Sequence, residues 1–169
     1  MDTRTTTTPS HTSSSTPDRD PATGSPTLLR LWELIEGIRF GMLAHRGDGG
    51  GLHAHPLTTI NRARDADRDA EALFFFIPKD GELYQRLQRD PQVVVTYANP
   101  SKDAYVSVSG HAGWIEDLAS KKERWSAATQ AWFPQGPEDP NVALLAVQIE
   151  DAEYWDVQES KMVQLWKMA

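Results

Sequence analysis

The sequence of 169 residues contains no cysteine. This absence excludes disulfides, thiolate metal ligands and cysteine nucleophiles. No apolar run approaches the roughly 20 residues that a membrane-spanning helix requires. Basic residues are also in the minority, 17 against 24 acidic ones, which gives a net charge of −7. Non-specific nucleic-acid binding needs a basic surface, so we do not expect nucleic acid as a partner. The lack of a long apolar run argues against a membrane as a partner, and we expect a cytoplasmic location.

The N-terminal segment 1–26 has little that a core could bury. Ser, Thr and Pro dominate its sequence, MDTRTTTTPSHTSSSTPDRDPATGSP. Such a composition does not offset the entropy that a chain loses on ordering. We therefore predict a disordered tail over 1–26. The segment also lacks the apolar stretch of a secretory signal.

The rest of the chain alternates between helical and strand patterns. Apolar residues at helical spacing follow Ser25 and Pro26, which predicts an amphipathic helix that ends near Gly37. Two further helices are expected at 80–90, with Asp80 as N-cap, and at 118–133. Strands are predicted at 40–46, 52–60, 72–78, 91–100, 104–117 and 142–157, with a polar segment over 61–71. This order favours an α+β fold built on an antiparallel barrel.

Two glycines interrupt the longest alternating strand. Gly110 and Gly113 lie inside YVSVSGHAGWIED at 105–117. A glycine within a strand is typical of a β-bulge or of a close approach between backbones. We therefore predict a bend or bulge in this strand.

Two histidines stand two residues apart in LHAHPLTTI at 52–60. Such positions share one face of a strand, so His53 and His55 could act together. A zinc or copper site needs three or four ligands, and His45 on the facing strand is a candidate third. No cysteine, HExxH motif or carboxylate cluster supports a metal. Polar histidines are therefore the favoured interpretation, and a metal hydrolase is the least favoured function.

Two other polar motifs do not indicate catalysis. Ser107, Ser109 and His111 share one face of a predicted strand, but no nucleophile elbow surrounds them. GDGGG at 47–51 lacks the Lys-Ser/Thr of a phosphate-binding P-loop and lies in a predicted hairpin, so we interpret it as a turn.

Aromatic residues gather late in the chain. Trp125, Trp132 and Phe133 lie on or at the end of one predicted helix, and Trp155 lies near the end of the last strand. Aromatic side chains at this density usually form core, but they also frame flat ligands and dimer interfaces.

Three stretches together resemble a known family. They are YVSVSGHAGWIED at 105–117, AWFPQGPEDPN at 131–141 and LLAVQIEDAEYWDV at 144–157. In order and spacing they are similar to the general stress protein group of the pyridoxamine 5'-phosphate oxidase-like, FMN-binding split barrels. The resemblance spans 27–158 and leaves 159–169 as a C-terminal extension. It implies a six-stranded antiparallel split β-barrel with short flanking helices, a cytoplasmic homodimer, and a role in stress or redox metabolism.

The resemblance also implies a flavin between the two subunits, FMN or possibly FAD, which would carry the electron chemistry. The ring would lie along the strand that holds Phe75, Phe76 and Ile77. The phosphate would lie near the second hairpin strand and the start of the helix after Pro78, where unpaired amides favour an anion. Trp132 and Phe133 would approach the ring from the partner subunit.

This sequence departs from the family at the phosphate. Relatives have Arg-Pro-Met or Arg-Pro-Leu where this chain has His55, Pro56 and Leu57, and Ser-x-Lys where it has Asp80, Gly81 and Glu82. An imidazole binds phosphate less well than a guanidinium, and Glu82 would repel it. Lys79 is a candidate for partial compensation. Two hypotheses therefore stay open: a flavin-dependent redox protein, and a split-barrel dimer that has lost tight FMN binding and serves as a binding or stress-associated module.

Overall fold

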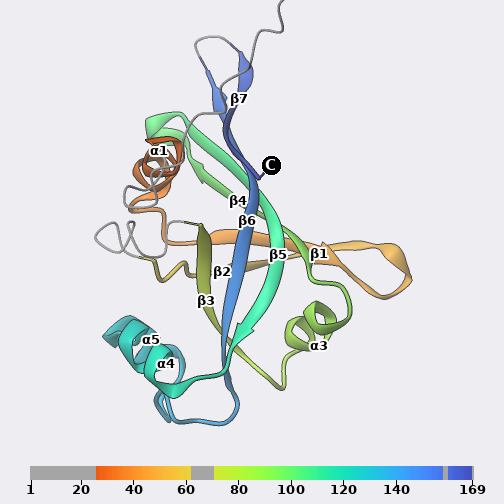
Figure 1. Ribbon diagram of the computed structural model, residues 1–169, viewed down its shortest axis with the longest axis vertical. Helices are drawn as coiled ribbons and strands as arrows, with labels where there is room; N and C mark the ends of the chain where they lie inside the picture. The colour runs from red at the N-terminus through yellow and green to blue at the C-terminus, as the bar shows by residue number, and fades with distance from the viewer. Residues whose placement is uncertain (1–25, 62–70, 158–159, 169) are drawn as a thin grey trace, which may run out of the picture.

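The computed structural model describes residues 26–61, 71–157 and 160–168. The expected tail, apart from Pro26, and nearly all of the expected polar segment 61–71 lie outside these residues. The elements run in the following order (Figure 1): α1 (Pro26–Ile35), β1 (Gly41–Arg46), the 3-10 turn η1 (Asp48–Gly50), β2 (Leu52–Leu57), β3 (Ala72–Pro78), α3 (Glu82–Arg89), β4 (Gln92–Asn99), η3 (Pro100–Lys102), β5 (Ala104–Ile115), α4 (Leu118–Arg124), α5 (Ala127–Trp132), β6 (Val142–Asp156) and β7 (Lys161–Lys167). Within the described residues, no helix is long and apolar enough to cross a membrane.

The strands form one antiparallel sheet that curls into a half-barrel, which confirms the predicted split-barrel fold. Its strands follow the order β2-β1-β4-β5-β6-β3, and β7 pairs with β6 outside this path. The curl brings the chain after β2 back to β3 at the other edge. There the N–H of Ile60 donates to the carbonyl of Phe74 at 3.0 Å. The side chain of Asn61 bonds the carbonyl of Ala72 and the N–H of Phe74, both at 2.8 Å.

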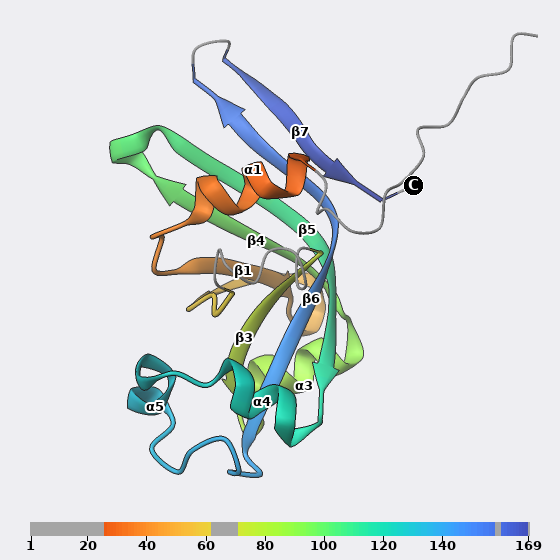
Figure 2. The same ribbon diagram turned by 60° about the vertical axis from the view of Figure 1, so that its left-hand side comes forward.

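The core lies mainly inside the curl. Alternate side chains of the strands point inward, and α1 packs on β5 and β7 across the concave side (Figure 2). The largest fully buried side chains are Phe75, Leu28, Leu31, Leu43, Leu73, Ile77, Leu87, Leu144, Leu145 and Ile149. A second, smaller cluster lies on the other face of β3 and β6. In it the ring of Phe76 meets Trp125 edge-on, with the centroids 4.9 Å apart.

Three predictions about individual elements were wrong. The helix expected at 118–133 is two helices, α4 and α5, because Ser126 is extended and its hydroxyl accepts the N–H of Thr129 as a second N-cap. The N-cap of α3 is Gly81 rather than Asp80, and no side chain caps it. The segment assigned to a C-terminal extension contains β7, a seventh strand of the sheet.

The predicted irregularity is found at Gly110, but the extra residue of the bulge lies on the partner strand. The register between β5 and β6 shifts between Ser109, which pairs with Asp151, and Gly110, which pairs with Ile149, so Glu150 of β6 is the extra residue. A Cβ on Gly110 would lie less than 3.0 Å from the carbonyl oxygen of Gln148, whereas one on Gly113 would meet only an oxygen of Ala146 at 3.8 Å. The backbones of β5 and β6 therefore approach each other closely at Gly110 but not at Gly113.

We predict that Gly110→Ala lowers the free energy of unfolding by about 1 to 3 kcal/mol, because a methyl group forces two hydrogen-bonded strands apart. Gly113→Ala is the matched control and should be neutral or slightly stabilising. Urea unfolding of both variants checks this prediction. Equal stabilities would show that the bulge does not need glycine.

Candidate functional site

Three histidines meet where the β1–β2 hairpin faces α3. His45 pairs with His53 across the two strands, and Leu43 pairs with His55, so all three imidazoles lie on one face. The ring of His45 stacks on that of His55 at 5.1 Å between centroids and on that of His53 at 5.9 Å. His45 is 2% exposed. We call His45, His53 and His55 the histidine cluster.

Hydrogen bonds assign the proton of each ring in the central pair. Nδ1 of His45 lies 2.8 Å from the carbonyl oxygen of Arg46, which can only accept, so Nδ1 carries the proton. With one proton on the His45 ring, its Nε2 is an acceptor, and Nε2 of His55, 3.1 Å away, donates to it.

The surroundings keep His55 neutral. Burial and the neighbouring His45 lower the pKa of His55 below its usual value, with smaller contributions from His53 and Arg86. The carboxylate of Glu82 raises the pKa of His55, but burial and the other neighbours together lower it by more. At neutral pH, His55 therefore does not supply the positive charge that an arginine would supply in its place.

The cation of this site is Arg86, on α3, which the sequence analysis missed. Its Nε donates to Oε1 of Glu82 at 3.0 Å, and its Nη2 bonds the same oxygen. Asp48 Oδ2 lies 3.6 Å from Nη2. The side chain is only 11% exposed, and among the described residues its buried Nη1 has no hydrogen-bond partner. The i,i+4 spacing from Glu82 is the one signal in the sequence that indicates this pair.

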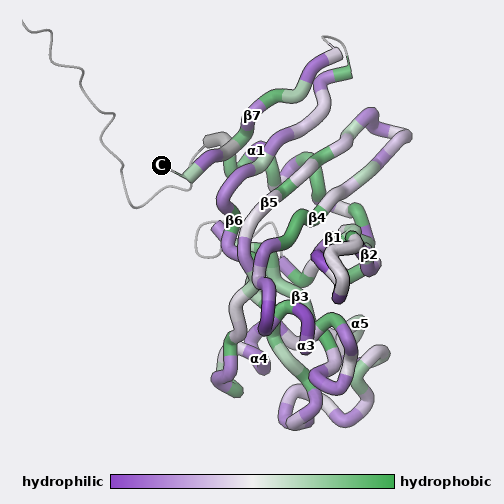
Figure 3. Tube along the Cα trace, turned by 90° about the vertical axis from the view of Figure 1, so that its right-hand side faces the viewer, coloured by the Kyte–Doolittle hydropathy of each residue, from purple (hydrophilic) through white to green (hydrophobic). Residues whose placement is uncertain are grey.

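The bond to Arg86 lowers the pKa of Glu82 and raises that of Arg86. Both groups therefore stay charged near neutral pH. Arg89 bonds the other oxygen of Asp48 at 3.4 Å but is 69% exposed. Figure 3 shows that α3, which carries these charges, is mostly hydrophilic. The site thus contains one nearly buried guanidinium, and carboxylates neutralise it on one side.

Metal binding finds no support in this geometry. Among residues 26–61, 71–157 and 160–168, no group of three or more His, Cys, Asp or Glu is placed to hold a metal ion. The two nearest ring nitrogens of the histidine cluster bond each other instead.

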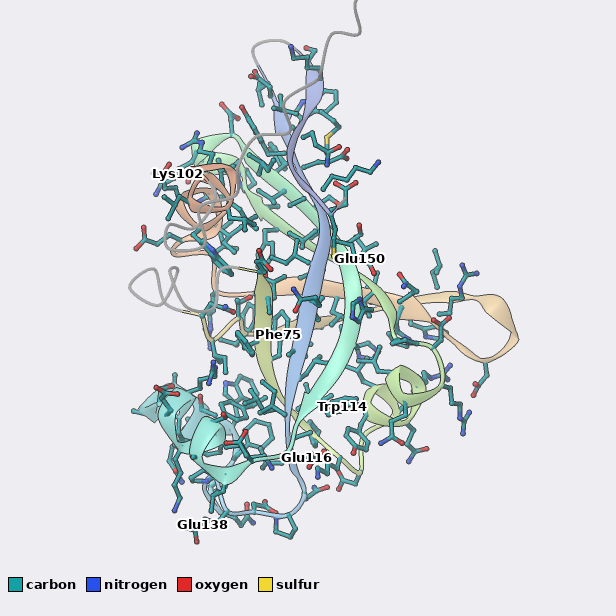
Figure 4. The ribbon with its side chains drawn as sticks, in the orientation of Figure 1. Phe75, Lys102, Trp114, Glu116, Glu138 and Glu150 are labelled. Carbon is teal, nitrogen blue, oxygen red and sulfur yellow. The ribbon has the colours of Figure 1, made fainter. Side chains whose placement is uncertain are left out.

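The structure separates the other predicted flavin residues. Phe75, on β3 in Figure 4, and Ile77 are buried in the main core, so only their backbones could touch a ligand. The side chain of Phe76 lies under Trp125. Leu57 packs against the main core, and the neighbouring Pro56 is exposed.

The residues after β3 and α5 have different surroundings. Nζ of Lys79 donates to Glu116 at 3.2 Å, at the end of β5 (Figure 4), and the N–H of Asp80 donates to Asn141 at 3.0 Å. Trp132 is 64% exposed, whereas Phe133 packs against Trp125. Of the predicted residues, His55 and Glu82 lie near each other between the hairpin and α3, and Phe76 and Phe133 lie together in the second cluster around Trp125.

The family model described as "Pyridoxamine 5'-phosphate oxidase like" matches residues 27–169. The chain belongs to this family. The match includes β7 and so extends beyond the boundary at 158 expected from the sequence. General stress protein 26 of Bacillus subtilis (strain 168) is 27% identical over 100 residues, which are 56% of this chain and 71% of that protein.

Solved structures agree with this assignment. A crystal structure of a protein related to general stress protein 26 from Clostridium acetobutylicum has a TM-score of 0.70 and 19% identity, and covers 83% of this chain and 94% of that one. The general stress FMN/FAD binding protein of Xanthomonas citri has a TM-score of 0.64 and 26% identity, and covers 85% of this chain and 95% of that one. One structural neighbour of this chain, that of Xanthomonas citri, is thus described as an FMN/FAD binding protein.

Arg86 is the described residue whose chemistry suits the phosphate of a flavin. A buried guanidinium N–H without a partner carries a free-energy cost, and a phosphate oxygen is the kind of acceptor that removes it. Nη1 of Arg86 is such a group, next to the histidine cluster. The carboxylates of Glu82 and Asp48 weaken the attraction of Arg86 for a phosphate, but they bond Nε and Nη2 and not Nη1.

We predict that the protein loses stability as pH falls through the range in which a free histidine titrates. The pKa of His55 is lowered in the folded state, so the unfolded chain binds this proton more readily and acid favours unfolding. The melting temperature should fall between about pH 7.5 and about pH 5.5, on either side of the usual histidine pKa near 6.5. His55→Gln should reduce this fall. His111→Gln, beside Glu150 and outside the histidine cluster, is the control and should not. The same pH dependence in the wild type and His55→Gln would contradict the prediction.

Proposed function

We propose that this protein binds FMN, with FAD as the less favoured flavin, and acts as a redox protein of the general stress group. The observation that carries the proposal is the unpartnered, buried Nη1 of Arg86 next to the histidine cluster. This site lies at the β2 strand and α3, where the resemblance puts the phosphate. The family membership and the Xanthomonas citri neighbour described as FMN/FAD binding support it. When bound, the flavin supplies the electron chemistry, and the chain binds and orients it.

Trp132 is our proposed contact to the flavin ring from a second subunit. Its indole is 64% exposed at the end of α5, a large apolar exposure for a residue without a ligand or partner. The side chains of Phe75 and Ile77 face the core. On β3 the ring would therefore rest on backbone, and an aromatic side chain from the other subunit would cover its free face.

A homodimer is part of the proposal, and the outer face of the sheet is its proposed interface. A shallow hollow of about 410 Å³ lies there, lined by exposed apolar side chains. These side chains come from β1, β5, β6, β7 and the segment before β1. They are Phe40, Met42, Tyr105, Trp155 and Met162, each more than a third exposed. Aromatic residues and methionine are enriched in interfaces. A second copy of the chain would remove this apolar surface from water.

The alternative function is a split-barrel dimer that does not hold FMN tightly. The carboxylates of Glu82 and Asp48 beside Arg86 favour it, because they oppose a phosphate that carries about −1.5 to −2 charges. Flavin affinity separates the two functions.

We predict that the purified protein quenches FMN fluorescence on binding and binds riboflavin at least about tenfold more weakly, because riboflavin lacks the charge-assisted bonds to phosphate. Parallel titrations with FMN, FAD and riboflavin test the proposal. A protein that binds none of the three would support the alternative function.

A second prediction concerns assembly. The wild type should sediment as a dimer at micromolar concentration. The double variant Tyr105→Ser with Trp155→Ser should shift it to monomer, because aromatic anchors often contribute about 2 kcal/mol or more at interfaces. Leu52→Ser is the control: Leu52 is an exposed apolar residue outside the hollow. A monomeric wild type would contradict the proposed interface.

A further inference from the structure

A hollow of about 300 Å³ lies where the C-terminal end of α1 meets the segment after β2. Trp32 and Ile35 line it from α1, and Thr59 and Asn61 line it from the segment after β2. We call it the α1 hollow. Its volume is at the lower end of the range of small-molecule sites. Among the described residues, its lining shares none with the histidine cluster, with Arg86 or with the hollow of the proposed dimer interface, so the proposed function leaves it unexplained.

The walls of the α1 hollow are held by bonds within the chain. Gly37, at φ +78°, ends α1 in the left-handed conformation, and the N–H of Ile38 donates back to the carbonyl of Ile35 at 3.0 Å. This turn brings Ile38 to the hollow together with Ile35. The side chain of Asn61 is fixed by its two bonds to the backbone of β3. The α1 hollow is therefore preformed.

Trp32, which lines the α1 hollow, carries an unsatisfied donor. Its side chain is 7% exposed, and its buried Nε1 has no hydrogen-bond partner among the described residues. An indole N–H can only donate, so this group needs an acceptor. A buried donor without a partner carries a free-energy cost, and a ligand that brings a carbonyl oxygen to the indole removes it.

The other polar groups of the α1 hollow restrict the charge of a ligand. The hydroxyl oxygen of Thr59 lies 2.7 Å from that of the buried Tyr97, where it accepts the phenol proton and keeps its own proton for a second acceptor. Glu36 adds an exposed carboxylate, which repels anions. Ile35 and Ile38 are apolar. The lining therefore suits an uncharged, mostly apolar molecule with an acceptor oxygen.

We propose that the α1 hollow is a second small-molecule site, which binds an uncharged ring compound with a carbonyl oxygen. The oxygen accepts from Nε1 of Trp32, and the apolar body packs against Ile35 and Ile38. This inference does not depend on flavin binding, because the two sites have no described residue in common.

Three probes of similar size test the site: acetophenone, which has a carbonyl, ethylbenzene, its hydrocarbon counterpart, and benzoate, an anion. In ¹H–¹⁵N spectra of the full chain, the indole signal of Trp32 is identified by its absence from Trp32→Phe. Acetophenone should move this signal downfield, because a hydrogen bond deshields the proton, and ethylbenzene should not. The backbone amide signals of Gly37 and Ile38 give the affinity for each probe.

Trp32→Phe keeps an aromatic wall and removes the N–H. The wild type should bind acetophenone about fivefold more tightly than ethylbenzene, the effect of one hydrogen bond. In Trp32→Phe the two affinities should agree within about twofold. Trp114→Phe is the matched control, since Trp114 contacts Tyr84 outside the α1 hollow, and should keep the preference. A ratio of two affinities in one protein does not change with a general loss of stability.

Glu36→Gln tests the exclusion of anions. It should tighten benzoate binding at the Gly37 and Ile38 signals about threefold or more at low salt, and less as salt is added. Glu33→Gln is the control, because Glu33 is an exposed carboxylate of the same helix outside the α1 hollow. Its benzoate affinity should stay within about twofold of the wild type.

The outcomes keep this site separate from the proposed function. If acetophenone moves neither the Trp32 indole signal nor the two amide signals, the site is overturned, whatever the affinity for FMN. Equal preference for acetophenone in the wild type and Trp32→Phe also overturns it. Addition of FMN should leave acetophenone binding unchanged, and competition between the two would contradict a second site.

Discussion

The close approach of Gly110 to the carbonyl of Gln148 is the contact on which the curl of the sheet depends. It lies at the register shift between β5 and β6, and a bulge of this kind increases the local twist of a strand pair. On one side of it β6 pairs with β3, and beyond it β6 pairs with β7. The long strand β6 therefore belongs to both ends of the half-barrel. The two edges of the sheet can then close through Ile60 and Asn61.

Pairing of neighbouring strands creates the candidate site. The helix α3 leads directly into β4, and β4 pairs with β1, where Val93 lies opposite His45. This pairing brings Glu82 and Arg86 to the hairpin that carries the histidine cluster. The polar site therefore assembles from the β1–β2 and β1–β4 pairs, and the contacts of Ile60 and Asn61 join the two outer edges of the same sheet.

The sequence predicted features that depend on near neighbours and missed those that depend on distant ones. Alternation and turn residues located the hairpin, β3 and β5. The break at Ser126 was missed because apolar spacing continues through it, and β7 because its partner β6 supplies the pairing that stabilises it. The resemblance directed attention to His55 and Glu82. It did not reveal Arg86, whose importance comes from burial and from an unpartnered nitrogen that only the folded chain shows.

The substitution of a histidine at position 55 is consistent with an arginine at position 86. Arg86 contributes to the lowered pKa of His55, so the two groups sense each other electrostatically. A second guanidinium at position 55 would face Arg86 and raise the cost of burying it. A neutral imidazole that donates to His45 adds no charge and leaves no buried donor unpaired. Glu82 and Asp48 then stabilise the remaining cation in the absence of a ligand. The positive charge of this site is thus carried by α3 rather than by β2, and the hairpin supplies neutral rings and the carboxylate of Asp48.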